Sequence, residues 1–299
     1  MLKRLNTYLR EMFPVPKQIV VSTILFFEIY FLVVFLSDVR DFYVGIPEIV
    51  GCITIFVFFL TLRIADDFKD YKHDKRLFAH RPLPSGRVYK KDLVVLLVLA
   101  NITALVLNII YMNNFLFYVV FMGFALLMSV WFFARDKIQK NLLLALVTHN
   151  PVAVIMNFYI ISFACIKYDL PLWSLNNVLI ALTLYWPSLI WEITRKTRAP
   201  EDETEYVTYS SLFGYKKVMR FVLLIITFDV ITSAKIMYEL WTPGVVAVVA
   251  AYVWFVVACL KFMKNPKVFK IVSRIEIYEL ITEVPVIMIQ IALILRWIV

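Results

Sequence analysis

Cysteine, histidine and charged residues are all scarce in this chain of 299 residues. The three cysteines and three histidines lie apart from one another, without the spacing of a disulfide framework or of a metal site built from these residues. Only 18% of the residues are charged, whereas soluble domains have about 25%. This composition excludes a disulfide-stabilised scaffold, a zinc module and an ordinary soluble globular domain.

Hydrophobic residues, in contrast, make up 62% of the chain and are gathered in long runs. A run of about 20 apolar residues is long enough for a helix to cross the hydrocarbon layer of a membrane, roughly 30 Å thick. The sequence predicts nine such spans, at 17–37, 45–65, 92–111, 115–134, 142–164, 176–194, 218–238, 243–262 and 277–298. We therefore expect an all-α, polytopic membrane protein with a single domain over residues 1–299 and a short interfacial helix within the basic segment 1–16.

Lysine and arginine are distributed unequally between the loops. The formal net charge is +9, and 26 of the 31 basic residues lie in the N-terminal segment and in alternate loops. By the positive-inside rule these segments are cytoplasmic, so we expect a cytoplasmic N-terminus and an outer C-terminus in the plasma membrane of a prokaryote. Because the charge follows the loops, it indicates orientation in the membrane and no nucleic-acid partner.

Four aspartates follow the second span directly: Asp66, Asp67, Asp70 and Asp74. If the helix continues through them, they share an arc of about 100°, since each residue advances the helix by about 100°. Oxygen ligands at this spacing suit Mg²⁺, which commonly binds one or two carboxylates together with substrate phosphates. We therefore expect all four to bind Mg²⁺, with Asp66 and Asp70 in the catalytic centre. The alternative is a solvated helix end in which Arg63, Lys69 and Lys72 pair with these acids.

This acidic motif resembles a signature of the UbiA superfamily of intramembrane prenyltransferases. That signature is N-D-x-x-D-x-x-x-D at the end of the second helix, followed by R-P-[LI]-P-S-G. The chain reads Asp66-Asp67-x-x-Asp70-x-x-x-Asp74 and then Arg81-Pro82-Leu83-Pro84-Ser85-Gly86. Asp66 stands where asparagine is usual, and it keeps an oxygen ligand. The resemblance implies nine helices around a central cavity with cytoplasmic cap loops, and an enzyme that uses Mg²⁺ to ionise an isoprenyl diphosphate.

The superfamily's second motif, usually Asp-x-x-x-Asp after the sixth helix, is matched only in part. Counting back from Thr208-Tyr209-Ser210 places Thr197 and Glu201 at the two aspartate positions, and threonine cannot supply a carboxylate. We therefore expect nearby acids to complete a metal site, with Glu192 also in the catalytic centre. The candidates are Glu192 together with one or two of Glu201, Asp202 and Glu205, of which Glu201 and Glu205 would share one face of a helix. The alternatives are a salt bridge from Glu192 to Arg195 or Lys196, and a solvated acidic loop over 201–205.

Basic residues beside the two acidic motifs are candidates to bind the diphosphate and to stabilise it as the C–O bond breaks. The candidates are Arg135 and Lys137 after the fourth span, Arg195 and Lys196 after the sixth, and Arg81. Members of the superfamily carry basic residues used in this way after the fourth helix. Each of these residues is equally a candidate topology determinant, and Arg81 a candidate loop anchor.

The resemblance favours a Mg²⁺-dependent prenyltransferase that acts on an isoprenyl diphosphate and an aromatic or lipid acceptor among membrane lipids. A membrane terpene cyclase, which needs the diphosphate alone, is the alternative enzyme. A transporter or a non-catalytic lipid-binding scaffold belongs to a different class. Transporters often show Gly- or Pro-broken spans in matching halves, and this sequence does not.

Overall fold

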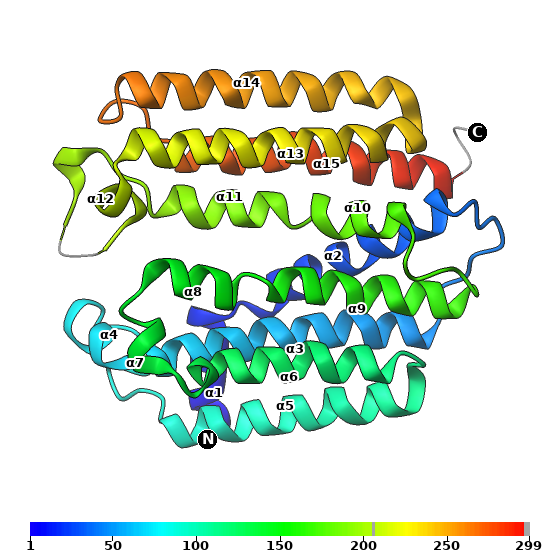
Figure 1. Cartoon of the computed structure of the whole chain (residues 1–299). Coiled ribbons are helices and arrows are strands. Elements are labelled where there is room, and N and C mark those ends of the chain that lie inside the picture. The colour runs from blue at the N-terminus through cyan, green and yellow to red at the C-terminus, as the bar shows by residue number, and fades with distance from the viewer. Residues whose placement is uncertain (205–206, 296–299) are drawn as a thin grey trace. The chain divides into compact units, whose positions relative to one another are not determined.

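The computed structural model describes residues 1–204 and 207–295, and every regular element in this part of the chain is a helix. Each predicted span corresponds to one long helix or to two helices in succession (Figure 1). In chain order these are α2 (Val15–Leu36), α3 (Ile46–Lys69), α5 (Lys90–Tyr111), α6 (Phe115–Ser129), α8 (Leu142–His149) with α9 (Val152–Lys167), α10 (Leu175–Thr183) with α11 (Trp186–Arg195), α13 (Tyr215–Trp241), α14 (Val245–Lys264) and α15 (Val272–Ile294). The predicted all-α fold class is confirmed.

Six stretches within the described residues are long and apolar enough to cross a membrane. One of them, Tyr215–Lys264, contains both α13 and α14, whereas α6 is shorter than the usual span. Along α5, large apolar side chains such as Leu99, Ile102 and Ile110 are more than half exposed. A bilayer solvates such a surface and water does not, so the helices belong to an integral membrane protein.

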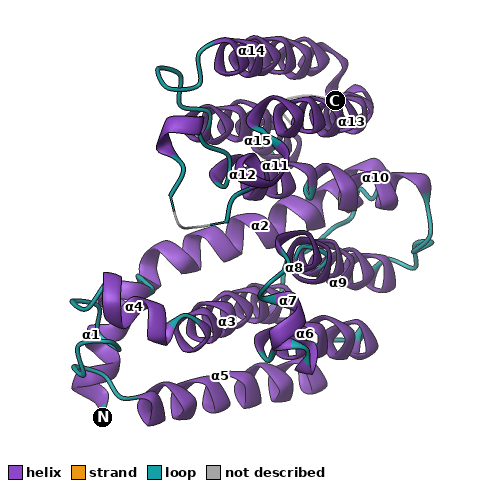
Figure 2. Ribbon diagram, turned by 60° about the vertical axis from the view of Figure 1, so that its left-hand side comes forward, coloured by secondary structure: helices purple, strands orange, loops and turns teal. Residues whose placement is uncertain are grey.

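The chain folds as two compact units. Unit 1 comprises residues 1–30, 41–138 and 158–170, and unit 2 comprises residues 31–40, 139–157 and 171–299. In unit 1, α3 packs against both α5 and α6, and the three helices lie side by side in Figures 1 and 2. In unit 2, α13 packs against α11 and α14, and α15 packs against the same two helices.

The core at one end of unit 1 joins segments that are far apart in the sequence. The helix α1 (Leu2–Met12) contributes Leu5 and Tyr8, the last turns of α3 contribute Ile64, and the R-P-L-P-S-G segment contributes Leu83. All four side chains are buried. The helix predicted within segment 1–16 thus exists, and its apolar face packs against the end of α3 where the acidic motif lies.

The fourth predicted span ends earlier than expected, because α6 stops at Ser129 rather than near residue 134. The three following aromatic residues, Trp131, Phe132 and Phe133, all have left-handed backbone conformations, with φ between 49° and 57°. Such residues rarely adopt this conformation, and it reverses the helical sense. The turn leads directly into α7 (Arg135–Ile138), which carries two of the predicted basic residues.

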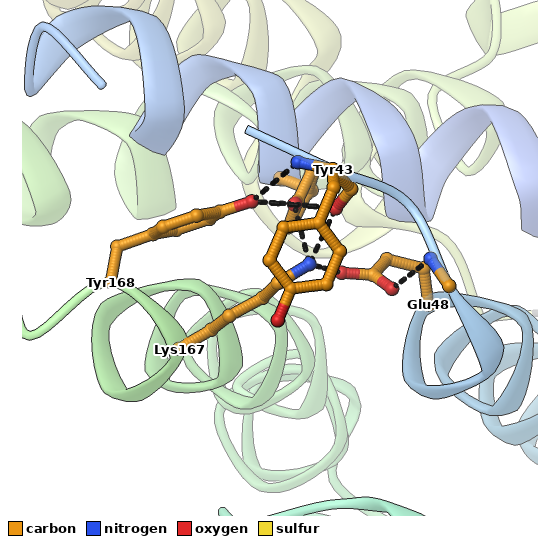
Figure 3. A network of polar contacts seen from close by, with 6 residues as sticks. Tyr43, Glu48, Lys167 and Tyr168 are labelled. Atoms are coloured by element: carbon orange, nitrogen blue, oxygen red, sulfur yellow. Dashed lines mark hydrogen bonds and ion pairs between the residues drawn. The ribbon is translucent and has the colours of Figure 1, made fainter. Parts of the chain in front are cut away.

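A buried ion pair connects the start of α3 with the end of α9 in unit 1 (Figure 3). The ammonium group of Lys167 pairs with the Glu48 carboxylate, and the two side chains are 7% and 0% exposed. Lys167 also lies 3.7 Å from the centre of the Tyr43 ring, and the second Glu48 oxygen accepts a hydrogen bond from the Gly45 amide. The polar atoms that this pair removes from water are therefore satisfied by one another and by the backbone.

Further polar side chains join the helices within unit 1. The Tyr159 hydroxyl donates a 2.8 Å hydrogen bond to Asn108, whose amide group donates to Thr54 at 2.7 Å. The contact links α9, α5 and α3 without any charge. Such hydrogen bonds are a common means of helix association where lipid removes the usual hydrophobic driving force.

Candidate functional site

The first acidic motif lies where α3 ends and α4 (Tyr71–Leu77) begins. The prediction that one helix continues through all four aspartates is wrong, because α3 ends at Lys69 and Asp70 joins the two helices. The amide of His73 donates to the carbonyl oxygen of Asp70, and the Arg135 side chain reaches the Lys69 carbonyl at 3.4 Å. The aspartates therefore do not share one helical face.

Asp67 is held on both of its oxygens. Its Oδ2 atom accepts a 2.6 Å hydrogen bond from the hydroxyl of Tyr8 on α1, and its Oδ1 atom pairs with Arg63, one turn earlier on α3. Asp67 is 5% exposed and Tyr8 is fully buried. These contacts engage the oxygens that a metal would need, so in this arrangement Asp67 is buried and held by Tyr8 and Arg63.

Asp74 is anchored in a similar way by the R-P-L-P-S-G segment. Nη1 of Arg81 lies 2.8 Å from Oδ2 of the buried Asp74 carboxylate, and the guanidinium group stacks over the Phe78 ring at 4.1 Å. The segment turns sharply at Gly86, whose φ of 76° favours glycine, and Val88 donates a backbone hydrogen bond to Pro82. Arg81 therefore acts as the loop anchor that was one of its two predicted roles.

Asp66 and Asp70 differ from the other two aspartates. Both are exposed, and no hydrogen bond or ion pair to another described side chain engages either carboxylate. They lie at the C-terminal end of α3, where the helix dipole is negative and favours cations. The surrounding protein displaces part of the solvent around Asp70, and Asp74 adds negative charge, so the pKa of Asp70 is raised above the usual aspartate value. Both carboxylates are thus presented to a cation.

Basic side chains lie at the same end of α3. Lys69 stands over the Trp131 ring at 4.8 Å, and Arg135 contacts the Lys69 carbonyl, so the left-handed turn brings α7 against the end of α3. Lys137 is exposed on α7, and among the described residues no ion pair joins it to the aspartates. Unit 1 thus assembles the first motif, Arg81 and Arg135 at one place.

The second acidic region belongs to unit 2, at the end of α11. Glu192 forms salt bridges with both of its basic neighbours: Arg195 contacts one carboxylate oxygen, and Nζ of Lys196 lies 2.8 Å from the other. Arg195 also stacks over Trp191 at 4.9 Å. The pairing follows the alternative interpretation of Glu192, and metal binding by this residue stays a prediction.

The segment after α11 is fixed by its threonines. Thr197 is buried and donates a 2.8 Å hydrogen bond to the Ile193 carbonyl, so its hydroxyl is engaged within the protein. Thr208 caps α12 (Tyr209–Phe213) and donates to Glu203 at 2.7 Å. Glu203 is a further acid that the sequence did not single out.

The predicted pairing of Glu201 with Glu205 on one helical face involves a residue, Glu205, that lies outside the described residues. Glu201 and Asp202 are exposed in a single 3₁₀ turn, Pro200–Asp202, and Glu203 after it is extended. Glu201 is therefore not in an α-helix within the described residues. Glu201 and Asp202 stay candidates as separate side chains.

Unit 2 also contains an apolar recess of about 300 Å³ beside this region. Its lining comes from α8, α11, α12 and α13: Leu143, Leu146, Ile193, Tyr209, Phe213, Lys217, Val218 and Phe221. The Tyr209 hydroxyl is buried and has no hydrogen-bond partner among the described residues. Burial and the nearby Glu192 raise the pKa of Tyr209, which keeps it a neutral donor.

The fold of the chain is similar to that of a known membrane protein. No protein-family model matches the sequence, and no curated protein does either. A solved structure of a digeranylgeranylglyceryl phosphate synthase in membranes is similar over 97% of this chain and 98% of its own, with a TM-score of 0.67 and 16% sequence identity. The chain has the fold of that structure. At this identity the similarity concerns the fold, so the chemistry rests on the residues of this chain.

Mg²⁺ is the metal predicted for the acidic motif at the end of α3. Among the described residues, no group of three or more histidine, cysteine, aspartate or glutamate side chains converges as a metal cage. Mg²⁺ does not need such a cage, because it keeps several waters and is commonly held by one or two carboxylates plus substrate phosphates. The exposed, unpaired carboxylates of Asp66 and Asp70 fit this requirement. The buried carboxylates of Asp67 and Asp74 instead form ion pairs with arginine side chains.

The contact of Tyr8 with the acidic motif was not predicted from the sequence. The residue is 59 positions away from its partner Asp67, and no local pattern links them. The available signal was the polar and apolar alternation of the N-terminal segment, which predicts a helix with a buried face but not what that face contacts. Tyr8 belongs to that face, together with Leu5.

Proposed function

We propose that the protein is a Mg²⁺-dependent intramembrane prenyltransferase that ionises an isoprenyl diphosphate and transfers the prenyl group to an acceptor. The similarity of the fold to that of a digeranylgeranylglyceryl phosphate synthase supports a transferase of this kind. One observation supports it most strongly: Asp66 and Asp70 present unpaired carboxylates at the C-terminal end of α3, where the helix dipole is negative. The neighbouring Asp67 and Asp74 are held by hydrogen bonds and ion pairs.

Mg²⁺, when bound, would supply positive charge to the diphosphate oxygens. Asp66 and Asp70 would hold it from the protein side. Arg135, which contacts the end of α3, and Lys137 on the same short helix would neutralise the remaining diphosphate charge as the C–O bond breaks. The pairs Asp67–Arg63 and Asp74–Arg81, in which the carboxylates are buried and the guanidinium groups partly exposed, would hold this end of unit 1 in place, so Asp66 and Asp70 would need little reorganisation.

In unit 2, Glu192, Arg195 and Lys196 form one ionic group that combines a carboxylate with two cations. We propose that a diphosphate attracts the two cations, which frees Glu192 for a second Mg²⁺ together with Glu201 or Asp202. Binding of metal and substrate would then be coupled through the same three side chains.

The apolar recess beside α11 supports an isoprenoid substrate. Its lining is almost wholly aliphatic and aromatic, and its volume of about 300 Å³ suits part of a prenyl tail. Exclusion of water from such a surface protects an allylic cation from hydrolysis.

The test uses purified protein in detergent with Mg²⁺ and allylic diphosphates of 10, 15 and 20 carbons, followed by mass spectrometry of organic extracts. The similar solved structure is named for a product that carries two geranylgeranyl chains on glyceryl phosphate. A C20 diphosphate with a glyceryl phosphate lipid is therefore the first pair to test, followed by aromatic acceptors. The matched controls are EDTA, Asp70→Ala, and Asp41→Ala, which changes an exposed aspartate in a different loop.

A prenylated acceptor that depends on Mg²⁺ and Asp70 supports prenyl transfer. Hydrocarbon or terpene alcohol formed without any acceptor would instead make the protein a cyclase. Binding of the diphosphate without turnover in any acceptor panel would favour a non-catalytic scaffold, and accumulation of substrate inside proteoliposomes would favour a transporter.

A further inference from the structure

Three polar side chains on one face of the helix α1 contact other segments of unit 1. Arg4 forms a bidentate ion pair with Asp92 at the start of α5, with N–O distances of 2.6 and 2.9 Å. Tyr8 donates to Asp67 at the end of α3, and Glu11 pairs with Arg87 just after the R-P-L-P-S-G segment. The spacing of four and three residues places these side chains on neighbouring turns of the same face. Of the three partners, Asp67 precedes segment 68–86 and Arg87 and Asp92 follow it. The contacts of α1 therefore hold both ends of this segment.

The three contacts differ in their surroundings. Glu11 and Arg87 are both more than 40% exposed, so water screens this pair and it contributes little. The contact between Tyr8 and Asp67 is buried on both sides, and its hydrogen bond of 2.6 Å involves an ionised acceptor. Hydrogen bonds of this kind are roughly twice as strong as neutral ones. The central contact of α1 is therefore the one that reaches the acidic motif.

Asp67 lies in sequence between the two aspartates that present free carboxylates. Without the Tyr8 hydroxyl, Oδ2 of Asp67 would be a buried acceptor with no partner, which is costly enough to make the side chain turn toward another cation. The nearest alternatives are Arg63, which already holds Oδ1, and whatever cation the motif binds. Either rearrangement disturbs the turn that orients Asp66 and Asp70.

We propose that Tyr8 is a positioning residue for the metal-binding motif: its hydroxyl holds Asp67 away from the metal and thereby fixes the orientation of Asp66 and Asp70. The proposal rests on the proposed function. It makes the helix α1 a part of the catalytic apparatus that acts through Asp67.

The experiment titrates Mn²⁺ into the full-length detergent-purified protein and follows free Mn²⁺ by electron paramagnetic resonance. The titration is made in the presence of geranylgeranyl thiolodiphosphate, which binds as a substrate analogue but is not ionised readily. The variant is Tyr8→Phe, which keeps the buried ring and removes only the hydroxyl. The matched control is Tyr159→Phe, which removes another buried hydroxyl of unit 1 that donates to a side chain, away from the motif.

We expect the dissociation constant for Mn²⁺ to rise about tenfold in Tyr8→Phe and to stay unchanged in Tyr159→Phe, since loss of an outer contact typically weakens metal binding 10- to 100-fold. The Mg²⁺ concentration for half-maximal turnover should rise in parallel, with little change in kcat at saturating metal. A variant that merely folds poorly would lower the number of Mn²⁺ sites and leave the affinity of the remainder unchanged.

Wild-type affinity in Tyr8→Phe, or equal losses in both tyrosine variants, would overturn the positioning role. In that case, Mn²⁺ binding that Asp70→Ala abolishes would leave the proposed function standing. Absence of Mn²⁺ binding by the wild-type protein with the analogue present would overturn the proposed function and the positioning role together.

Discussion

Lys167 and Glu48 form a buried ion pair that joins the end of α9 to the start of α3. Removal of one partner leaves an uncompensated charge in a low-dielectric setting, which costs about 3–5 kcal/mol of stability. Lys167→Met alone should therefore lower the thermal midpoint in detergent strongly. The double variant Lys167→Met with Glu48→Gln should recover much of the loss, because neither remaining side chain carries a charge.

A matched control for this pair is Lys235→Met, which breaks the more exposed bridge to Glu239 in α13. Exposed pairs contribute at most about 1 kcal/mol, so the midpoint should change little. If the single variant at Lys167 is no less stable than the double variant, the ion pair does not lock the two helices.

Asp66 stands where the motif that it resembles usually has asparagine, and its carboxylate is exposed and unpaired. Asp66→Asn keeps an oxygen ligand and should retain most of the Mg²⁺-dependent turnover. Asp66→Ala removes the ligand and should lower kcat/KM by about 100-fold or more, the magnitude expected when a charge-stabilising group is lost. The measurement is pyrophosphate release at several Mg²⁺ concentrations, and equal activity of the two variants would contradict a ligand role for Asp66.

The raised pKa of Asp70 predicts how pH acts on stability without metal. Because the folded protein binds this proton more tightly than the unfolded chain, the group stabilises the fold at low pH, and that contribution is lost as pH rises through the raised pKa. At neutral pH without metal, Asp70→Asn should therefore melt above the wild type, and the difference should shrink as pH is lowered toward the usual aspartate range.

Addition of Mg²⁺ with a diphosphate should reverse this order, because only the wild type gains stability from bound metal. Thermal unfolding with and without Mg²⁺ at two pH values measures both effects. A wild type that is already more stable than Asp70→Asn in EDTA would show that ionised Asp70 has a stabilising partner, contrary to the geometry described above.

Glu192 offers a further test, since it is bound to Arg195 and Lys196. Glu192→Gln removes the charge that a metal would need but keeps the shape of the side chain. If Glu192 contributes to a second Mg²⁺ site, the variant should need more Mg²⁺ for half-maximal turnover. An unchanged Mg²⁺ requirement with a raised KM for the diphosphate would show that Glu192 only orients its two basic neighbours.

The sequence predicted the helices well because long apolar runs leave little choice in a membrane. It also placed the acidic motif and the R-P-L-P-S-G segment at one end of the second span. The break of α3 at Lys69 escaped prediction, since no proline or glycine marks it. The carbonyl of Lys69 instead finds a donor in Arg135, 66 positions later, and a contact of this kind has no local signature.

The roles of individual aspartates were equally hidden. The four aspartates of the motif look alike in the sequence. In the structure, Tyr8 and Arg63 engage Asp67, and Arg81 engages Asp74. Asp66 and Asp70 stay exposed. The early end of α6 has a similar cause, because three aromatic residues take left-handed conformations that aromatic residues seldom adopt. These features arise from tertiary contacts, so periodicity and motif spacing could not reveal them.

The most direct test of the account is the release of pyrophosphate from geranylgeranyl diphosphate in the presence of a glyceryl phosphate lipid acceptor. Wild type, Asp70→Ala and Asp41→Ala are compared at rising Mg²⁺, and the product is analysed by mass spectrometry. The account predicts Mg²⁺-dependent release by wild type and Asp41→Ala, loss of about 100-fold or more in Asp70→Ala, and a product that contains both prenyl chain and acceptor. Release that is indifferent to Mg²⁺ or to Asp70 would contradict it.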